Sequence, residues 1–214
     1  MNSIKPLTEL LQTDEIYIIF GGPSLKDFDF SKLDNKATLA CNKCAEIYNA
    51  DCVISVDPTY INTRKDFLKN YNGYVAIGYR ATDMGDNKKP SDSTLSHINP
   101  DYLYWHDKKH PDKMSDDPYT LYGSNTGHAA INFAVLQGFK TIHLLGLDLN
   151  KRGHWHGGYS HSRQNEQWLN DWAMMLDNCK EYLDNKGVKM INYNKKSGVR
   201  SYPFSDYREF EVVA

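Results

Sequence analysis

The chain has 214 residues, enough for one domain with a substantial core, and its formal net charge is −2 at pH 7. A protein that binds duplex nucleic acid usually carries an excess of basic residues, which this chain does not have. No apolar run reaches the roughly 18 residues that span a bilayer. The first ten residues lack the apolar core of a signal peptide, and four cysteines are too few and too unevenly placed for a disulfide framework. We expect a cytoplasmic protein with reduced thiols.

The first strong element is residues 16–20, a run of β-branched and aromatic residues typical of a strand buried on both faces. It ends at Gly21-Gly22-Pro23-Ser24. Glycines permit φ > 0 and let a ligand approach without a Cβ in the way, and the serine offers a hydroxyl. Ligands of open parallel sheets bind outside the carboxyl ends of the strands, so we predict a nucleotide at this turn. A Gly-Gly-Pro turn without a ligand is the alternative.

Strands and helices alternate after this turn. Apolar runs predict strands at 37–42, 52–56 and 73–78, with helical stretches at 45–48 and 61–71. Strands separated by helices require crossover connections, which are typical of parallel sheets with helices on their faces. The sequence therefore predicts an α/β fold with a mainly parallel sheet.

Residues 80–122 interrupt the alternation. The segment is rich in Asp, Asn, Lys, Pro and His, and only residues 102–106 look extended. A long segment without periodicity inside a compact domain is usually a functional lid or a disordered insertion. Because Tyr102, Tyr104 and Trp105 would be unusual in a solvated segment, we predict a lid that orders over a bound ligand.

The order returns at Ser124-Asn125-Thr126-Gly127, which precedes a helix with apolar residues through 130–136. The polar residues can cap this helix, and its first backbone N–H groups have no partner within the helix. Such a helix N-terminus binds anions readily. The sequence therefore predicts a second part of the ligand site here.

A fifth strand is predicted at 141–145, and Asp148 follows its end. In a parallel sheet Asp148 then lies at the same edge as Gly22, Asn42 and Asp57, so four strand ends converge on one crevice. Asp57 and Asp148 are candidates to hydrogen-bond a ribose or an amino group. Since Asp57 precedes a proline, capping of the next helix fits it equally well.

The glycine-containing loop at 150–163 concentrates His154, His156 and His161. The ordinary pKa of histidine lies near neutral pH, so a histidine beside strand ends can act as a general base, and His161 is our candidate. Two alternatives stay open. His161 is a surface residue, or the three histidines bind zinc or manganese together with Asp148.

A long amphipathic helix is predicted at 165–186, a last strand at 188–193, and a polar tail at 195–214. Trp168 and Trp172 lie one helical turn apart, which favours packing of both into the core.

Six short motifs follow one another along the chain. They are Gly21-Gly22-Pro23-Ser24-Leu25, Phe28-Asp29-Phe30-Ser31, Cys41-Asn42, Ser124 to Gly127, Gly146-Leu147-Asp148 and Ser160-His161-Ser162. In their order and spacing the chain resembles the bacterial lipooligosaccharide sialyltransferases over roughly residues 16–193. Motility-associated flagellin-modifying proteins and archaeal hydroxymethylpterin pyrophosphokinases share the Gly-Pro-Ser-Leu turn, and uncharacterised phage proteins look similar.

The resemblance implies one modified Rossmann domain, residues 1–214, with a lid at about 80–122 and the tail at about 195–214. It implies a glycosyltransferase that needs no metal, in which His161 occupies the position of the family's catalytic base. The implied nucleotide-binding residues are Gly21, Gly22, Pro23, Ser24, Asn42, Asp57, Ser124, Asn125, Thr126, Gly127 and Asp148.

The chain departs from the family after Asp148. The sialyltransferases have tyrosines there that stabilise the leaving phosphate, whereas this chain has Leu149 and Asn150. A cation or a phenol can stabilise the developing charge, so Arg152 and Tyr159, with Lys151 as a further candidate, are expected to take this role.

The expected function is transfer of a sugar from a nucleotide-sugar donor, CMP-sialic-acid-like or related, to the hydroxyl of an unknown acceptor. No cofactor is expected for this reaction. One alternative is a pyrophosphokinase-like phosphoryl transferase that uses Mg²⁺ with Asp57 and Asp148. The other is a nucleotide-binding or sequestering protein without activity. The sequence leaves the oligomeric state open, including a homo-oligomer.

Overall fold

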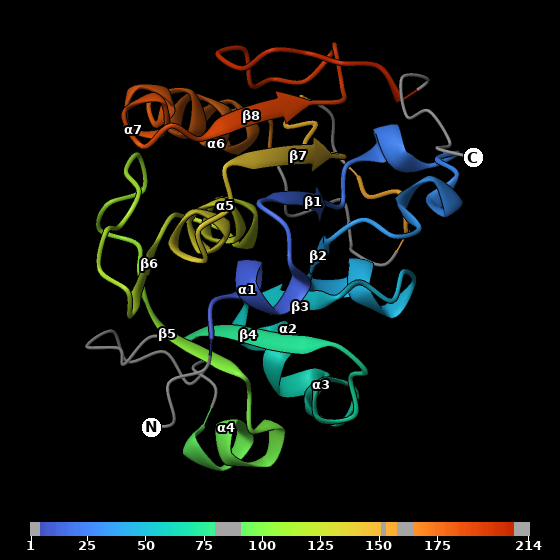
Figure 1. Cartoon of the computed structure of the whole chain (residues 1–214), viewed down its shortest axis with the longest axis vertical. Helices are drawn as coiled ribbons and strands as arrows, with labels where there is room; N and C mark the ends of the chain where they lie inside the picture. Colours follow the sequence, from blue (N-terminus) through green and yellow to red (C-terminus); the bar gives the residue numbers. More distant parts are fainter. Residues whose placement is uncertain (1–4, 80–90, 151–152, 158–164, 208–214) are drawn as a thin grey trace.

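Within the part of the chain that the structure describes, eight parallel strands form a single sheet in the order β6-β5-β4-β3-β2-β1-β7-β8 (Figure 1). This computed structural model describes residues 5–79, 91–150, 153–157 and 165–207. The strands are β1 (Glu15–Ile19), β2 (Thr38–Cys41), β3 (Cys52–Ser55), β4 (Tyr74–Tyr79), β5 (Tyr102–Asp107), β6 (Thr120–Tyr122), β7 (Thr141–Leu145) and β8 (Lys189–Asn192). The helices are α1 (Leu7–Leu11), α2 (Pro58–Thr63), α3 (Lys65–Lys69), α4 (Asp92–Ile98), α5 (Thr126–Leu136), α6 (Glu166–Asp177) and α7 (Lys180–Asn185), with short 3₁₀ turns η1 (Pro23–Leu25), η2 (Phe30–Leu33) and η3 (Asn42–Glu46). The predicted α/β fold with a parallel sheet is confirmed.

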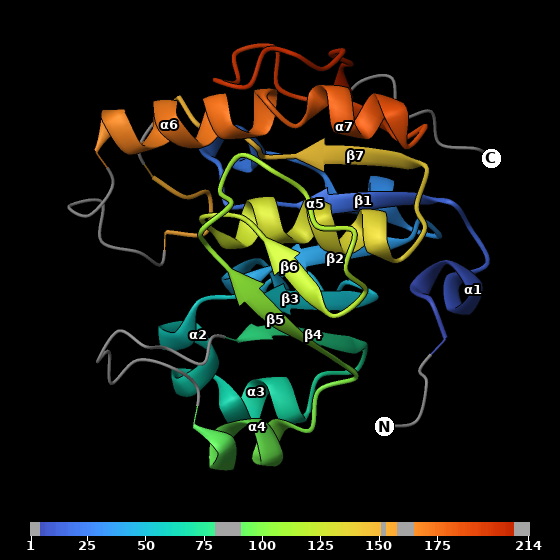
Figure 2. The ribbon, with the colours of Figure 1, turned by 90° about the vertical axis from the view of Figure 1, so that its left-hand side faces the viewer.

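The central strands are apolar along their whole length because both faces of the sheet are covered. In β1, Ile16 and Ile18 pack with α5 on one face, whereas Tyr17 and Ile19 pack on the other face. Figure 2 shows α5 lying across β1 and β2, and Figure 1 shows the short helices that follow β1 and β2 on the opposite side of the sheet. The core therefore has two layers, one on each side of β1.

The chain reverses its direction across the sheet after β6. Strands β1 to β6 are added one after another on one side of β1, and α5 then carries the chain back, so that β7 pairs with the other side of β1. Two neighbouring strands whose connections leave in opposite directions leave a crevice at their carboxyl ends. In this sheet that crevice lies between β1 and β7.

The expected lack of regular structure at 80–122 is wrong over the part that the structure describes, whereas closure of this segment over a ligand stays a prediction. Helix α4 and strands β5 and β6 lie within it, and β5 pairs with β4 along its length. Tyr102 and Tyr104 of β5 are buried, whereas Leu103 and Trp105 are exposed. This period-2 alternation gives only a weak signal in the sequence, because polar residues surround a short strand. Residues 80–90 lie outside the described residues.

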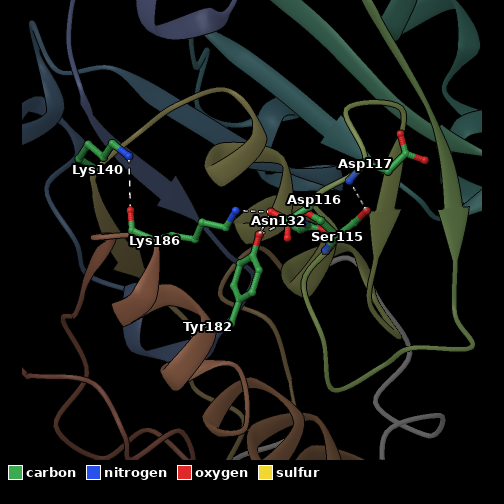
Figure 3. Close-up of polar contacts among 7 residues, drawn as sticks. All are labelled: Ser115, Asp116, Asp117, Asn132, Lys140, Tyr182 and Lys186. Carbon is green, nitrogen blue, oxygen red and sulfur yellow. Dashed lines mark hydrogen bonds and ion pairs between the residues drawn. The ribbon is translucent and has the colours of Figure 1, made fainter.

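The loop before β6 is tied to two helices. The buried side chain of Asn132 on α5 accepts from the backbone N–H of Ser115 (3.0 Å) and donates to its carbonyl (3.1 Å). Asp116 pairs with Lys186 and accepts a hydrogen bond from the Tyr182 hydroxyl (2.8 Å), as Figure 3 shows. These contacts fix the loop to the core.

Both long predicted helices are divided in two. The helix predicted at 165–186 is α6 followed by α7, and the one predicted at 61–71 is part of α2 and α3. The predicted polar tail also packs on the domain as far as residue 207, with Val199 and Tyr202 buried. Among the residues described, no helix combines the length and the apolar character needed to cross a bilayer.

Candidate active site

A cavity of about 370 Å³ opens at the carboxyl ends of the strands, at the crevice between β1 and β7. This volume falls in the usual range for small-molecule sites, roughly 300 to 1,000 Å³. The predicted site residues that line it are Gly21, Gly22, Asn42, Asp57, Ser124, Asn125, Thr126, Gly127 and Asp148. Pro23 and Ser24 do not line it. Residues that are up to 127 positions apart in the chain therefore meet as predicted.

The turn after β1 needs glycine for a reason that differs from the prediction. Gly22 has φ −63° and ψ 144°, an extended conformation, so φ > 0 is not required. A Cβ there would lie 2.3 Å from the carbonyl oxygen of Gly146 and 2.5 Å from Cγ of Asp148. The Gly22 N–H also donates to that carbonyl (2.9 Å). Gly22 is therefore required because the turns after β1 and β7 touch each other.

Asp148 holds the turn in place. Its carboxylate accepts from Ser24 N (2.8 Å), from Ser24 Oγ (2.6 Å) and from Asn194 Nδ2 (2.7 Å). The side chain is nearly buried, since Asp148 is 4% exposed. Ser24 thus lies behind the cavity wall and contributes to the site through Asp148.

A second group of contacts joins β2, β3 and α5. Asn42 directly follows β2 in a left-handed conformation with φ 51°. Its Nδ2 donates to Thr126 Oγ1 (3.2 Å), which also accepts from Val56 N (3.4 Å). Asp57 Oδ1 accepts from Thr59 N (2.8 Å), so Asp57 caps α2, as the alternative interpretation predicted. Asp57 also lines the cavity.

The N-terminus of α5 forms one end of the cavity. Asn125 is its N-cap, and Asn125 Oδ1 accepts from His128 N (3.0 Å). Thr126 and Gly127 are the first residues of the helix, where backbone N–H groups have no carbonyl partner within the helix. The partial positive charge of this end favours an anion. Lys108 lines the same cavity and adds a cation, which sequence reasoning misses because Lys108 lies in the segment predicted as a lid.

Residues 153–157 cover the turn after β1. Trp155 N donates to Gly21 O (3.0 Å), and Trp155 Nε1 donates to Phe20 O (3.0 Å). This anchor places His154 and His156 in the cavity wall, with their rings stacked at 5.0 Å. Burial, followed by the nearby His154 and a lysine, lowers the pKa of His156 to about 4, so its imidazole is neutral at pH 7.

Three predicted catalytic residues, Arg152, Tyr159 and His161, lie outside the described residues, as does Lys151. Within the described part of the chain, no group of three or more His, Cys, Asp or Glu side chains could hold a metal ion.

The remaining wall comes from α6. Leu169 and Trp172 line the cavity, whereas Trp168 is 49% exposed. The prediction that both tryptophans pack into the core is therefore wrong: Trp168 is exposed, and Trp172 is half-buried in the cavity wall. The apolar face of α6 follows Leu169, Ala173 and Leu176, which are buried, and Trp168 lies beside this face.

No family model and no curated protein sequence matches the chain. Among solved structures, the monofunctional alpha-2,3-sialyltransferase Cst-I from Campylobacter jejuni is similar with a TM-score of 0.52 at 14% identity, over 97% of this chain and 84% of that chain. The sialyltransferase CstII from the same organism, in complex with CMP-3FNeuAc, is similar with a TM-score of 0.48 at 14% identity, over 84% of this chain and 81% of that chain. The similarity to Cst-I shows that the chain has the fold of a sialyltransferase.

Proposed function

We propose that the protein is a glycosyltransferase that moves a sugar from a nucleotide-sugar donor, CMP-sialic-acid-like or related, to an acceptor hydroxyl. The observation that carries this proposal is the cavity at the crevice between β1 and β7, which combines the N-terminus of α5 with Lys108. The fold shared with Cst-I, an alpha-2,3-sialyltransferase, supports the same reaction class.

The cavity offers a separate surface to each part of such a donor. We assign the phosphate to the N–H groups of Thr126 and Gly127, because a helix N-terminus favours an anion and Lys108 lines the same cavity. Asn42 and Asp57 offer polar atoms for the ribose or the base at the ends of β2 and β3. Apolar walls then exclude water from the bond that breaks. They include Phe20, Leu147, Leu149, Leu169 and Trp172.

In this mechanism His161 takes the proton of the acceptor hydroxyl. The hydroxyl oxygen forms a bond to the anomeric carbon of the sugar, while the bond from that carbon to the phosphate oxygen breaks and its electrons leave with the nucleotide. We assign Arg152 and Tyr159 to the developing phosphate charge, which a cation or a phenol can stabilise. No metal takes part in any of these steps.

Phosphoryl transfer with Mg²⁺ is the second candidate, and the donor set disfavours it. Mg²⁺ in such enzymes is held by carboxylates together with substrate phosphates. Asp148 already accepts three hydrogen bonds from Ser24 and Asn194, and Asp57 Oδ1 caps α2. Both carboxylates are therefore occupied with local structure.

Binding is tested by calorimetric titration with CMP, UDP, GDP, ADP and ATP. We expect CMP to bind, and Lys108→Met to weaken its binding by about 5- to 50-fold, because a charged hydrogen bond to phosphate is lost. Lys109→Met is the matched control, since Lys109 is the next residue and does not line the cavity. Equal CMP affinity in the Lys108→Met and Lys109→Met variants would contradict the placement of the phosphate.

Turnover is tested with CMP-sialic acid and a set of acceptor saccharides. His161→Ala should lower kcat by about 10² to 10⁴, the usual contribution of a general base, with little change in CMP affinity. Transfer of a phosphoryl group from ATP that EDTA abolishes and Mg²⁺ restores would support phosphoryl transfer instead. Tight CMP binding without turnover on any donor would support a sequestering protein. Full activity of His161→Ala would reject this base, and His156 in the cavity wall would be the next candidate.

A further inference from the structure

The C-terminal segment, residues 194–202, lies against the loop after β7 that forms one wall of the cavity. Leu147, Asp148 and Leu149 of this loop line the cavity. The hydrogen bonds between loop and segment run from Ser197 Oγ to Leu147 O (2.6 Å), from Gly198 N to Asp148 O (2.6 Å) and from Asn150 Nδ2 to Lys196 O. The segment therefore determines where this wall stands.

The same contacts hold an unusual backbone conformation. Leu149 has φ 46°, in the left-handed region, which costs a leucine about 1–2 kcal/mol. A Cβ at residue 198 would lie 2.4 Å from the Leu149 carbonyl oxygen, so only Gly198 lets the segment approach this closely. Backbone strain of this kind persists where the surroundings enforce it, and such sites are often functional.

Asn194 connects the segment, through Asp148, to the turn after β1. Its Nδ2 donates to Asp148 Oδ1 (2.7 Å), the oxygen that also accepts from Ser24 Oγ (2.6 Å). Asp148 Oδ2 accepts from Ser24 N (2.8 Å). A nearly buried carboxylate keeps its position only while its hydrogen bonds are made, because an unpaired charge is costly to bury. A shift of Asp148 would therefore move the turn that contains Gly22 and Ser24.

We propose that Asn194 is a positioning residue of the ligand site, which acts through Asp148 on the turn at residues 21–24. The proposal rests on the proposed function insofar as the ligand is a nucleotide. It assigns part of the site to the residue that precedes the predicted polar tail at 195–214.

The test replaces the amide of Asn194 by a second carboxyl group. In Asn194→Asp, two carboxylates at hydrogen-bond distance repel each other at about pH 8, whereas at about pH 5 one of them takes up a proton and can donate to the other. The nearby Tyr207 also faces Asp148, and burial raises the pKa of its phenol, so Tyr207 stays neutral throughout. Asn185→Asp, at an exposed position of α7, is the matched control.

Two quantities are measured at both pH values: the hydrogen-exchange protection factor of the Ser24 amide, by NMR, and the Kd of CMP. At high pH we expect Asn194→Asp to have a Ser24 protection factor about 10-fold or more below that of wild type and a Kd of CMP higher by a similar factor. At low pH both quantities should return toward the wild-type values. Wild type at the same pH is the reference, because the CMP phosphate itself takes up a proton between the two pH values, and Asn185→Asp should match wild type at both. Asn194→Ala covers the case that Asn194→Asp does not fold, and should lower Ser24 protection at both pH values.

Unchanged Ser24 protection in the Asn194 variants would overturn the proposal, because Asn194 would not hold the turn. Lost protection with unchanged CMP affinity would overturn it as well, because the turn would not matter for the ligand. If wild type binds no CMP, the proposed function fails, while the exchange of the Ser24 amide still decides whether Asn194 positions the turn.

Discussion

Gly22→Ala tests whether the turn after β1 depends on close contact with the turn after β7. Gly22 has φ −63°, which alanine adopts without strain, so any cost comes from the new Cβ atom. That atom would lie 2.3 Å from the Gly146 oxygen and 2.5 Å from Asp148 Cγ, and backbone atoms must move to relieve the contact.

The expected loss of stability follows from these contacts. Overpacking a tight site costs about 1–3 kcal/mol, and losing the hydrogen bond from Gly22 N to Gly146 O adds about 0.5–1.5 kcal/mol. We therefore expect Gly22→Ala to lower the free energy of unfolding by about 2–4 kcal/mol. For a chain of this size the Tm falls by about 5–15 °C.

Urea denaturation, with a titration of CMP, measures the effect, and Gly187→Ala is the control. Gly187 has φ +66°, and a Cβ added to it would meet no atom within 4 Å, so its substitution costs only conformational strain, about 1 kcal/mol. If Gly22→Ala were no more destabilising than Gly187→Ala and bound CMP like wild type, the contact between the two turns would not explain this glycine.

Two further predictions concern buried polar groups. Burial lowers the pKa of His128 to about 4, whereas a histidine in the unfolded chain has a pKa near 6.5. Between these pH values the unfolded chain therefore binds more protons than the folded chain. The free energy of unfolding of wild type should fall by up to about 3 kcal/mol through His128 as the pH falls from about 6.5 to 4. In His128→Gln, the free energy of unfolding measured by urea denaturation should depend less steeply on pH over this range. An equally steep pH dependence in the variant would refute the prediction. Asn132→Leu leaves the Ser115 N–H without its acceptor and should lower the free energy of unfolding by about 3–5 kcal/mol. Asp116→Asn, at an exposed ion pair with Lys186, should lower it by less than about 1 kcal/mol. Similar losses in both variants, measured by thermal unfolding, would contradict the view that burial makes the difference.

Local sequence patterns predict most of the sheet. Continuous apolar runs identify the strands that are buried on both faces, because burial on two sides leaves no room for polar residues. The signal is weaker for β5, which the sequence marks only as an extended stretch at 102–106. One face of this strand is exposed, and Tyr102 and Tyr104 alternate with Leu103 and Trp105. An edge region carries a weaker signal, since half of its residues face water.

The candidate site likewise has features that the sequence predicts and features that it does not. The sequence by itself determined that the turn at Gly21 and Gly22, the start of α5 and the end of β7 lie at one edge, because parallel strands bring their carboxyl ends together. Only the tertiary structure decided what these residues do there. Lys108 lines the cavity, and Asp148 binds both Ser24 and Asn194, through contacts between segments that are far apart in the chain. Such contacts depend on the packing of side chains across the whole domain, and no local pattern of residues records them.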